Sequence, residues 1–172
     1  YALLAEDFAV VVLDNAQRTF EEEGLSLLSR VLAMEEVHKA VVAFHIPVPN
    51  HFILNCVSEE EFSRLKEAYG PWKEKVSFLL CGHVHSRFED RVDGIMLLCT
   101  GGGGAMIEDV SKEIRACDVE HHVVHFYMEE GILKYRFSNL SEDCYGRESE
   151  DDVLRQKLQE AVQGELMAHF RY

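Results

Sequence analysis

Polar and apolar positions alternate along this chain in blocks that match buried strands and the helices between them. Four blocks are almost continuously apolar, which is the pattern of strands covered on both faces of a sheet. These blocks span residues 8–13, 40–44, 76–80 and 95–99. Each is too short for a helix of ordinary length, so we interpret all four as central strands of one sheet.

Two helices are predicted between these strands. Residues 24–39 carry apolar side chains at helical spacing, and the glutamates at 21–23 suit the positive end of a helix dipole. A second helix is predicted to begin after Ser58, which forms a capping-box pattern with Glu61, and to end at residues 70–71, Gly-Pro. Strand, helix and strand in succession predict an α/β fold with parallel strands at its centre.

The chain changes character after residue 85. Polar residues 86–91 predict a loop, and the Asp-Gly pair at 93–94 predicts a turn into the fourth strand. Residues 123–128 alternate between the two faces of a strand and return through a Glu-Gly turn to residues 132–137. This pattern predicts a β-hairpin, with His121, His122 and His125 as residues of the sheet surface.

The last 32 positions suggest a separate segment. Residues 141–152 are acidic and rich in helix breakers, which predicts a linker, and residues 153–172 have the spacing of an amphipathic helix. We therefore expect a main domain over residues 1–140. The terminal helix would dock on this domain, on a partner or on a second copy, so an oligomer formed through residues 153–170 is one expectation.

Histidines follow two of the predicted strands at the point where each strand ends. His45 follows the second strand, and His83 and His85 follow the third, directly after Gly82. Residues i and i+2 of an extended segment point the same way, so His83 and His85 can converge on one site. Imidazole is the commonest metal ligand in proteins, and α/β sheets bind ligands at the carboxyl ends of their strands. This edge of the sheet is the candidate metal site.

Three motifs in order resemble the second half of the calcineurin-like metallophosphoesterases. Residues 42–47 read Val-Ala-Phe-His-Ile-Pro, residues 81–85 read Cys-Gly-His-Val-His, and residues 100–105 read Thr-Gly-Gly-Gly-Gly-Ala. The resemblance covers about residues 8–137. That family also has an early Asp-x-His, a Gly-Asp-x-x-Asp and a Gly-Asn-His, and none of these three motifs occurs in this sequence.

The resemblance implies a fold and a site. The fold would be the second half of an αββα sandwich, with a mixed sheet, flanking helices and a C-terminal β-hairpin. His45 and His83 would bind one divalent metal ion (Mn, Fe, Zn or similar) and His85 a second. Two such ions activate a nucleophile at neutral pH and hold the phosphoryl oxygens for in-line displacement. The catalytic residues and the bridging aspartate would belong to the absent first half.

Other residues near these motifs have weaker assignments. His51 lies in the loop after His45 and is either a substrate contact or a solvated loop residue. The four glycines at 101–104 lack the Gly-Lys-Ser/Thr ending of a phosphate-binding P-loop, so we interpret them as glycines that allow close backbone approach or positive φ beside the site. Gly102 and Gly103 among them are candidate substrate contacts. Asp14, at the end of the first strand, is expected to be a loop or cap residue.

Composition limits the partners and the compartment. The formal charge is −14, which argues against a large nucleic-acid surface and leaves the attraction of a phosphate ester to local charge. Five cysteines without Cys-x-x-Cys spacing suit a reducing compartment, so a cytoplasmic location is expected. No apolar run reaches the length needed to span a membrane.

Two functions remain open on the sequence. The first is a phosphoesterase, incomplete as this chain alone, whose main partner is the missing N-terminal half of the domain. It is favoured because the strand at residue 8 has the character of an interior strand, which needs a neighbour. The second is a non-catalytic metal-binding or assembly module that retains half of the fold, since three histidines can hold a single Zn²⁺. The upstream coding sequence would distinguish the two.

Overall fold

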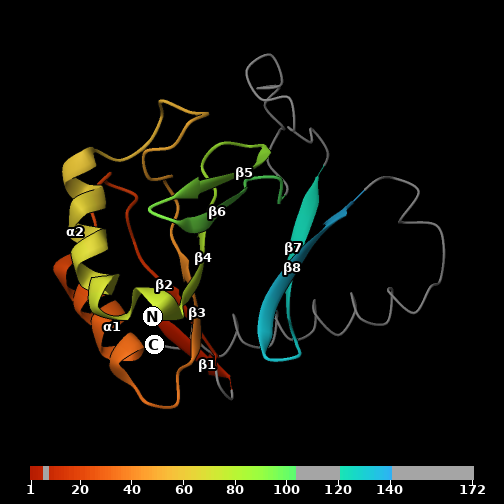
Figure 1. The fold of residues 1–172 in the computed structure, drawn as a ribbon. Helices are drawn as coiled ribbons and strands as arrows, with labels where there is room; N and C mark the ends of the chain where they lie inside the picture. Colours follow the sequence, from red (N-terminus) through yellow and green to blue (C-terminus); the bar gives the residue numbers. More distant parts are fainter. Residues whose placement is uncertain (6–7, 104–120, 141–172) are drawn as a thin grey trace, which may run out of the picture. The chain divides into compact units, whose positions relative to one another are not determined.

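A six-stranded mixed sheet forms the centre of the computed structural model, which describes residues 1–5, 8–103 and 121–140 (Figure 1). Its strands are β1 (Ala2–Ala5), β2 (Phe8–Val12), β3 (Lys39–Ala43), β4 (Val76–Cys81), β5 (Arg87–Val92) and β6 (Ile95–Thr100), in the order β1-β2-β3-β4-β6-β5. The inner strands β2, β3, β4 and β6 run parallel, and the edge strands β1 and β5 are antiparallel to their neighbours. The predicted α/β class with a mixed sheet is confirmed.

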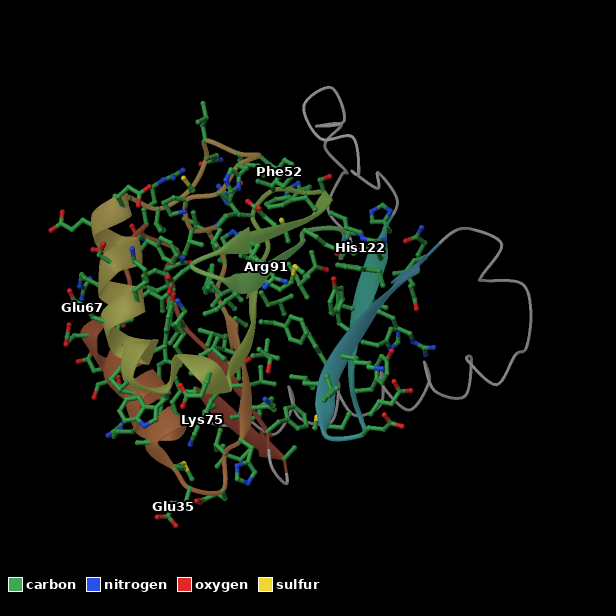
Figure 2. All side chains as sticks on the ribbon, in the orientation of Figure 1. Glu35, Phe52, Glu67, Lys75, Arg91 and His122 are labelled. Carbon is green, nitrogen blue, oxygen red and sulfur yellow. The ribbon has the colours of Figure 1, made fainter. Side chains whose placement is uncertain are left out.

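Within the described ranges, two α-helices cover one face of this sheet (Figure 1). Helix α1 (Glu22–Ala33) buries Leu25, Leu28, Val31 and Leu32. The predicted extension of this helix to residue 39 is wrong, because Met34 already has extended backbone angles. Lys75, labelled in Figure 2, donates to the carbonyl oxygens of Leu32 and Met34 at 2.9 Å, which caps the helix where it ends.

Helix α2 (Glu59–Tyr69) begins as predicted. The Ser58 hydroxyl accepts a hydrogen bond from the backbone N–H of Glu61 at 3.2 Å. The Glu61 carboxylate accepts instead from the backbone N–H of Phe20 and pairs with Arg64. A short 3₁₀ helix, η1 (Gly70–Lys75), follows and leads into β4.

The segment predicted as a loop at residues 86–91 is strand β5, and that prediction is wrong. Asp93 and Gly94 both have positive φ, which is the geometry of a tight hairpin turn, and the turn pairs β5 with β6. Only Phe88 and Val92 of β5 are buried. An edge strand can form with only two residues that point into the core. The apolar content of residues 86–91 was therefore too low to predict β5 from the sequence.

Strands β7 (His122–Glu129) and β8 (Ile132–Asn139) form the predicted hairpin. It packs on the sheet face opposite to the helices, where Phe78 contacts the rings of Phe126 and Tyr135. His125 pairs with the exposed Arg136 on the other face of the hairpin, as expected. His122 is 1% exposed, so its prediction as a surface residue is wrong.

Strand β1 supplies the neighbour that β2 was expected to lack within this chain. All four β1 residues pair antiparallel with β2, so the sheet of six strands is formed by this chain alone. Leu3 and Leu4 of β1 are both more than half exposed. Strand β2 is therefore paired on both sides within this chain, and the expectation that it needs a partner strand from an absent half is wrong.

The expected linker at residues 141–152 and helix at residues 153–172 lie outside the described residues. Among the residues that the structure does describe, no helix is long and apolar enough to cross a membrane.

Gly101 is required by the close approach of two backbone segments. A Cβ atom at this position would lie 1.8 Å from the carbonyl oxygen of Val84 and 3.0 Å from the Cα atom of His85. The Gly101 N–H also donates to the carbonyl oxygen of Ser86 at 3.0 Å. The glycine after β6 thus lets the chain lie directly against the histidine segment after β4, as the sequence predicts for this motif.

We expect Gly101→Ala to destabilise the fold by about 3 kcal/mol, because the new methyl group overlaps backbone that must shift. Urea unfolding followed by circular dichroism measures the change. Gly103→Ala is the matched control, since a Cβ at Gly103 meets nothing within 4 Å. Equal stability of the two variants would contradict the close packing of Gly101 on the histidine segment.

Candidate functional site

The ends of β3 and β4 are held side by side by backbone hydrogen bonds. The N–H of Phe44 donates to the carbonyl oxygen of Leu80 at 2.9 Å, and the N–H of Gly82 donates to that of His45 at 3.0 Å. The parallel pairing thereby continues beyond both strands. It places His45 next to the segment that carries His83.

His45 and His83 meet at this edge of the sheet. His45 Nε2 and His83 Nδ1 are 3.3 Å apart, with ring centroids 5.1 Å apart and ring planes at 79°. Two imidazole nitrogens bound to one tetrahedral zinc ion, each at about 2.0–2.1 Å, lie about 3.3–3.4 Å from each other. The pair therefore has the nitrogen separation of two ligands of one metal ion.

His85 is placed in the same segment, directly against Gly101. Among the described residues, however, no group of three or more His, Cys, Asp or Glu side chains is arranged to hold a metal ion. The structure brings together two of the three predicted ligands. The assignment of all three to metal ions stays a prediction.

The backbone around His83 is unusually compact. His83 has a φ of +66°, which is uncommon for a residue with a side chain. The thiol of Cys99 lies 3.4 Å from the carbonyl oxygen of Gly82 and 3.7 Å from that of Val84. Strand β6 therefore packs directly against this segment. Burial, followed by the neighbouring Cys99 thiol, raises the pKa of the Cys81 thiol. A protonated thiol at Cys81 adds no charge at the end of β4.

Asn15 fixes the chain at His45 and was not identified from the sequence. Its side chain is buried, and its Oδ1 accepts from the backbone N–H of His45 at 3.0 Å and of Ile46 at 2.9 Å. Its Nδ2 donates to the carbonyl oxygen of Ile46 at 2.8 Å. Asp14 beside it accepts from the N–H of Ala16 at 2.9 Å, which is the cap role expected for it. The signal available in the sequence was an amide residue shortly after an apolar strand.

Asn55 and Arg18 were also missed. Asn55 Nδ2 lies 2.9 Å from His83 Nε2, and an Arg18 guanidinium nitrogen lies 2.6 Å from Asn55 Oδ1. The second guanidinium nitrogen donates to the carbonyl oxygen of Cys56 at 3.0 Å. Both residues are exposed loop positions without a motif, so only the fold brings them to the histidines.

His51 pairs with a carboxylate. Its Nδ1 lies 3.0 Å from both oxygens of Asp90, and its backbone N–H donates to Asp90 at 2.9 Å. Burial raises the pKa of Asp90, but the hydrogen bonds from His51 and from the N–H of Arg91 outweigh it and hold this pKa below its usual value. The His51 side chain remains 79% exposed. Its role toward substrate stays a prediction.

The two glycines predicted to lie beside the substrate have different surroundings. Gly102 is buried, and its carbonyl oxygen accepts from the N–H of His122 at 3.1 Å, so it joins the end of β6 to β7. Gly103 is exposed. The structure thus gives Gly102 a packing role and leaves contact with substrate a prediction for both.

Comparison with known proteins shows similarity at the level of structure. No family model and no curated protein sequence matches this chain. GAP50, the anchor in the inner membrane complex of Plasmodium, matches with a TM-score of 0.58 at 12% identity over 78% of this chain and 45% of that chain. This likeness shows the fold alone.

Two further solved structures match with lower scores. A 5′-nucleotidase from Staphylococcus aureus, in complex with alpha-ketoglutarate, matches with a TM-score of 0.46 at 14% identity over 93% of this chain and 33% of that chain. PhoD matches with a TM-score of 0.41 at 13% identity over 81% of this chain and 40% of that chain. The chain thus spans less than half the length of each of the three structures.

We expect Asn15→Ala to destabilise the fold by about 3 kcal/mol, because it leaves the backbone N–H and carbonyl of buried Ile46 and the part-buried N–H of His45 without their partner. Chemical unfolding measures this loss. Asp14→Ala, which removes only an exposed turn contact, is the control and should change stability by less than about 1 kcal/mol. A similar loss from both variants would show that Asn15 does not fix the His45 segment.

Proposed function

We propose that this chain is the second half of a metal-dependent phosphoesterase domain and hydrolyses phosphate mono- or diesters together with the rest of that domain. The observation that carries the proposal is the His45–His83 pair at the carboxyl ends of two adjacent parallel strands, with facing nitrogens 3.3 Å apart. This is the edge at which α/β sheets bind ligands. The motif resemblance assigns these same two histidines to one ion.

The donor set fits a divalent metal ion in part. His45 and His83 would hold one ion through the two nitrogens that face each other, and imidazole suits Zn or Fe better than Mg or Ca. His85 would serve a second ion, as the resemblance implies. When bound, such ions act as Lewis acids toward a phosphoryl group. Manganese occupancy and a dinuclear centre belong to this proposal.

Local groups, rather than the net charge, would attract the substrate. The chain carries a formal charge of −14, which repels a phosphate ester at long range. The amide of Asn55 lies against His83, and the guanidinium of Arg18 is hydrogen-bonded to Asn55 on its other side. The proposal therefore places the phosphoryl group at the outer side of the pair, toward the loop that carries Asn55.

The remainder of the domain would complete the site. No carboxylate joins the histidine pair within the described residues. Two adjacent cations need bridging negative charge to offset their repulsion. The bridging aspartate and the group that assists the leaving oxygen are proposed to come from a separate N-terminal half, the main partner of this chain. An oligomer formed through residues 153–170 and a cytoplasmic location stay proposals as well.

A non-catalytic metal-binding or assembly module is the second candidate. One observation favours it: β1 gives β2 its neighbour, so this chain builds a sheet of six strands by itself. A fold likeness to GAP50, described as an anchor, is compatible with such a role. An upstream sequence with Asp-x-His and Gly-Asp-x-x-Asp motifs would favour the enzyme, and a native start at Tyr1 would favour the module.

We expect His45→Ala and His83→Ala each to weaken Zn²⁺ binding by at least about tenfold, because each removes one of two facing ligands. Competition with a chromophoric chelator measures the affinity. His125→Ala is the matched control, since His125 lies on the outer face of the hairpin, and it should bind as the unchanged chain does. Equal losses from all three variants would place the metal on other histidines.

We expect residues 1–172 alone to bind at most one divalent metal ion tightly and to show no significant turnover of an aryl phosphate, because no bridging carboxylate is matched in this chain. Elemental analysis and Mn²⁺-stimulated hydrolysis measure the two quantities. Co-expression with the N-terminal half should restore the second ion and activity. Two ions per chain with robust turnover would contradict the proposed division of the site.

A further inference from the structure

Four side chains from separate segments form one line of hydrogen bonds that ends at the histidine pair. It begins at Arg18, whose φ is +65°, in the loop after β2. The Arg18 guanidinium donates to Asn55 Oδ1 at 2.6 Å, and the Asn55 amide lies 2.9 Å from His83 Nε2. His83 Nδ1 then lies 3.3 Å from His45 Nε2.

The chemistry of Arg18 decides the direction of every bond in this line. A guanidinium has only donors, so the atom of Asn55 that faces it must be the amide oxygen. The amide nitrogen, a donor, therefore faces His83, and His83 Nε2 must accept. A neutral imidazole that accepts at Nε2 carries its proton on Nδ1. His83 Nδ1 then donates to His45 Nε2.

This proton position conflicts with a shared metal ion. A metal ion between the two rings needs a lone pair on His83 Nδ1 and on His45 Nε2. The proton of neutral His83 must then sit on Nε2, where it becomes a donor that faces the donor nitrogen of Asn55. Two donors cannot satisfy each other, so the Asn55 amide must turn over. Its nitrogen would then face the donors of Arg18, and that contact must break.

We propose that Arg18 and Asn55 form a tautomer lock, meaning that their hydrogen bonds hold neutral His83 in the form with its proton on Nδ1. This form opposes metal binding until the Asn55 amide turns over and its hydrogen bond with Arg18 breaks. The inference rests on the proposed function, because it takes the facing nitrogens as the metal ligands. Proton number is conserved: His83 loses a proton from Nδ1 to solvent and gains one at Nε2. Metal occupancy is thereby coupled to the position of Arg18 and of the loop at residues 50–57.

Asn55→Asp tests the lock without removing a contact. A carboxylate accepts from both sides, so it keeps the Arg18 bond and favours the His83 tautomer with the proton on Nε2. We expect ¹⁵N NMR of the metal-free chain to show the Nδ1–H form of His83 in the original protein and the Nε2–H form in the variant. Partners of this kind change metal affinity by about 10–100-fold. Zn²⁺ affinity should accordingly rise about tenfold.

Two further variants separate the tautomer from charge. Leu54→Asp adds the same negative charge at a fully exposed neighbouring position, and we expect little change in tautomer or Zn²⁺ affinity. Arg18→Met frees the Asn55 amide to turn. We expect it to give a mixture of the two His83 tautomers and a smaller rise in affinity than Asn55→Asp.

The outcomes distinguish this inference from the proposed function. An Nε2–H form of His83 in the original metal-free chain, or equal Zn²⁺ affinities of Asn55→Asp and Leu54→Asp, would overturn the lock while metal binding by the pair stands. Zn²⁺ binding that His45→Ala leaves unchanged would overturn the metal site itself. The tautomer measured without metal would still report whether Arg18 and Asn55 set the proton of His83.

Discussion

The candidate site depends on the parallel pairing of β3 with β4 and on its continuation past the ends of both strands. The backbone bond from Gly82 to His45 carries this pairing one residue beyond the sheet. Parallel strands bring equivalent ends to one edge, so two histidines that are 38 positions apart in sequence face each other there. A shift of one residue in either strand would turn one imidazole to the opposite face.

Close packing beneath the pair maintains a backbone that would otherwise relax. His83 holds a positive φ, and such a conformation persists where its surroundings over-determine it. The surroundings are specific here: Gly101 leaves no room for a side chain, and the Cys99 thiol faces the carbonyl oxygens of the segment. The glycine after β6 therefore acts on the site through packing. This role differs from a direct contact with substrate.

Sequence pattern was sufficient where burial or chemistry leaves a periodic signal. The four central strands, the start of α2 at Ser58 and the terminal hairpin follow from apolar runs, a cap and alternation. Edge strands β1 and β5 carry too little buried surface to give such a signal. Of the site, His45, His83 and His85 were predicted because imidazoles at the carboxyl ends of strands suit a metal ion and because their motifs resemble those of a known family. Arg18 and Asn55 were not predicted, because they lie in two loops without a motif and only the folded chain brings these loops to His83.

The two facing nitrogens can be satisfied in two ways, and the balance between them decides what the site does. As a hydrogen bond, the His83–His45 contact contributes about 1 kcal/mol, and the Asn55 and Arg18 bonds add to the same state. The binding free energy of a single ion held by only two imidazoles must exceed the sum of these hydrogen-bond contributions. A third ligand, particularly a carboxylate, adds both a bond and charge neutralisation. Completion of the ligand set would therefore shift the pair from hydrogen bond to metal site, which makes the surrounding residues, rather than the fold, the determinant of function.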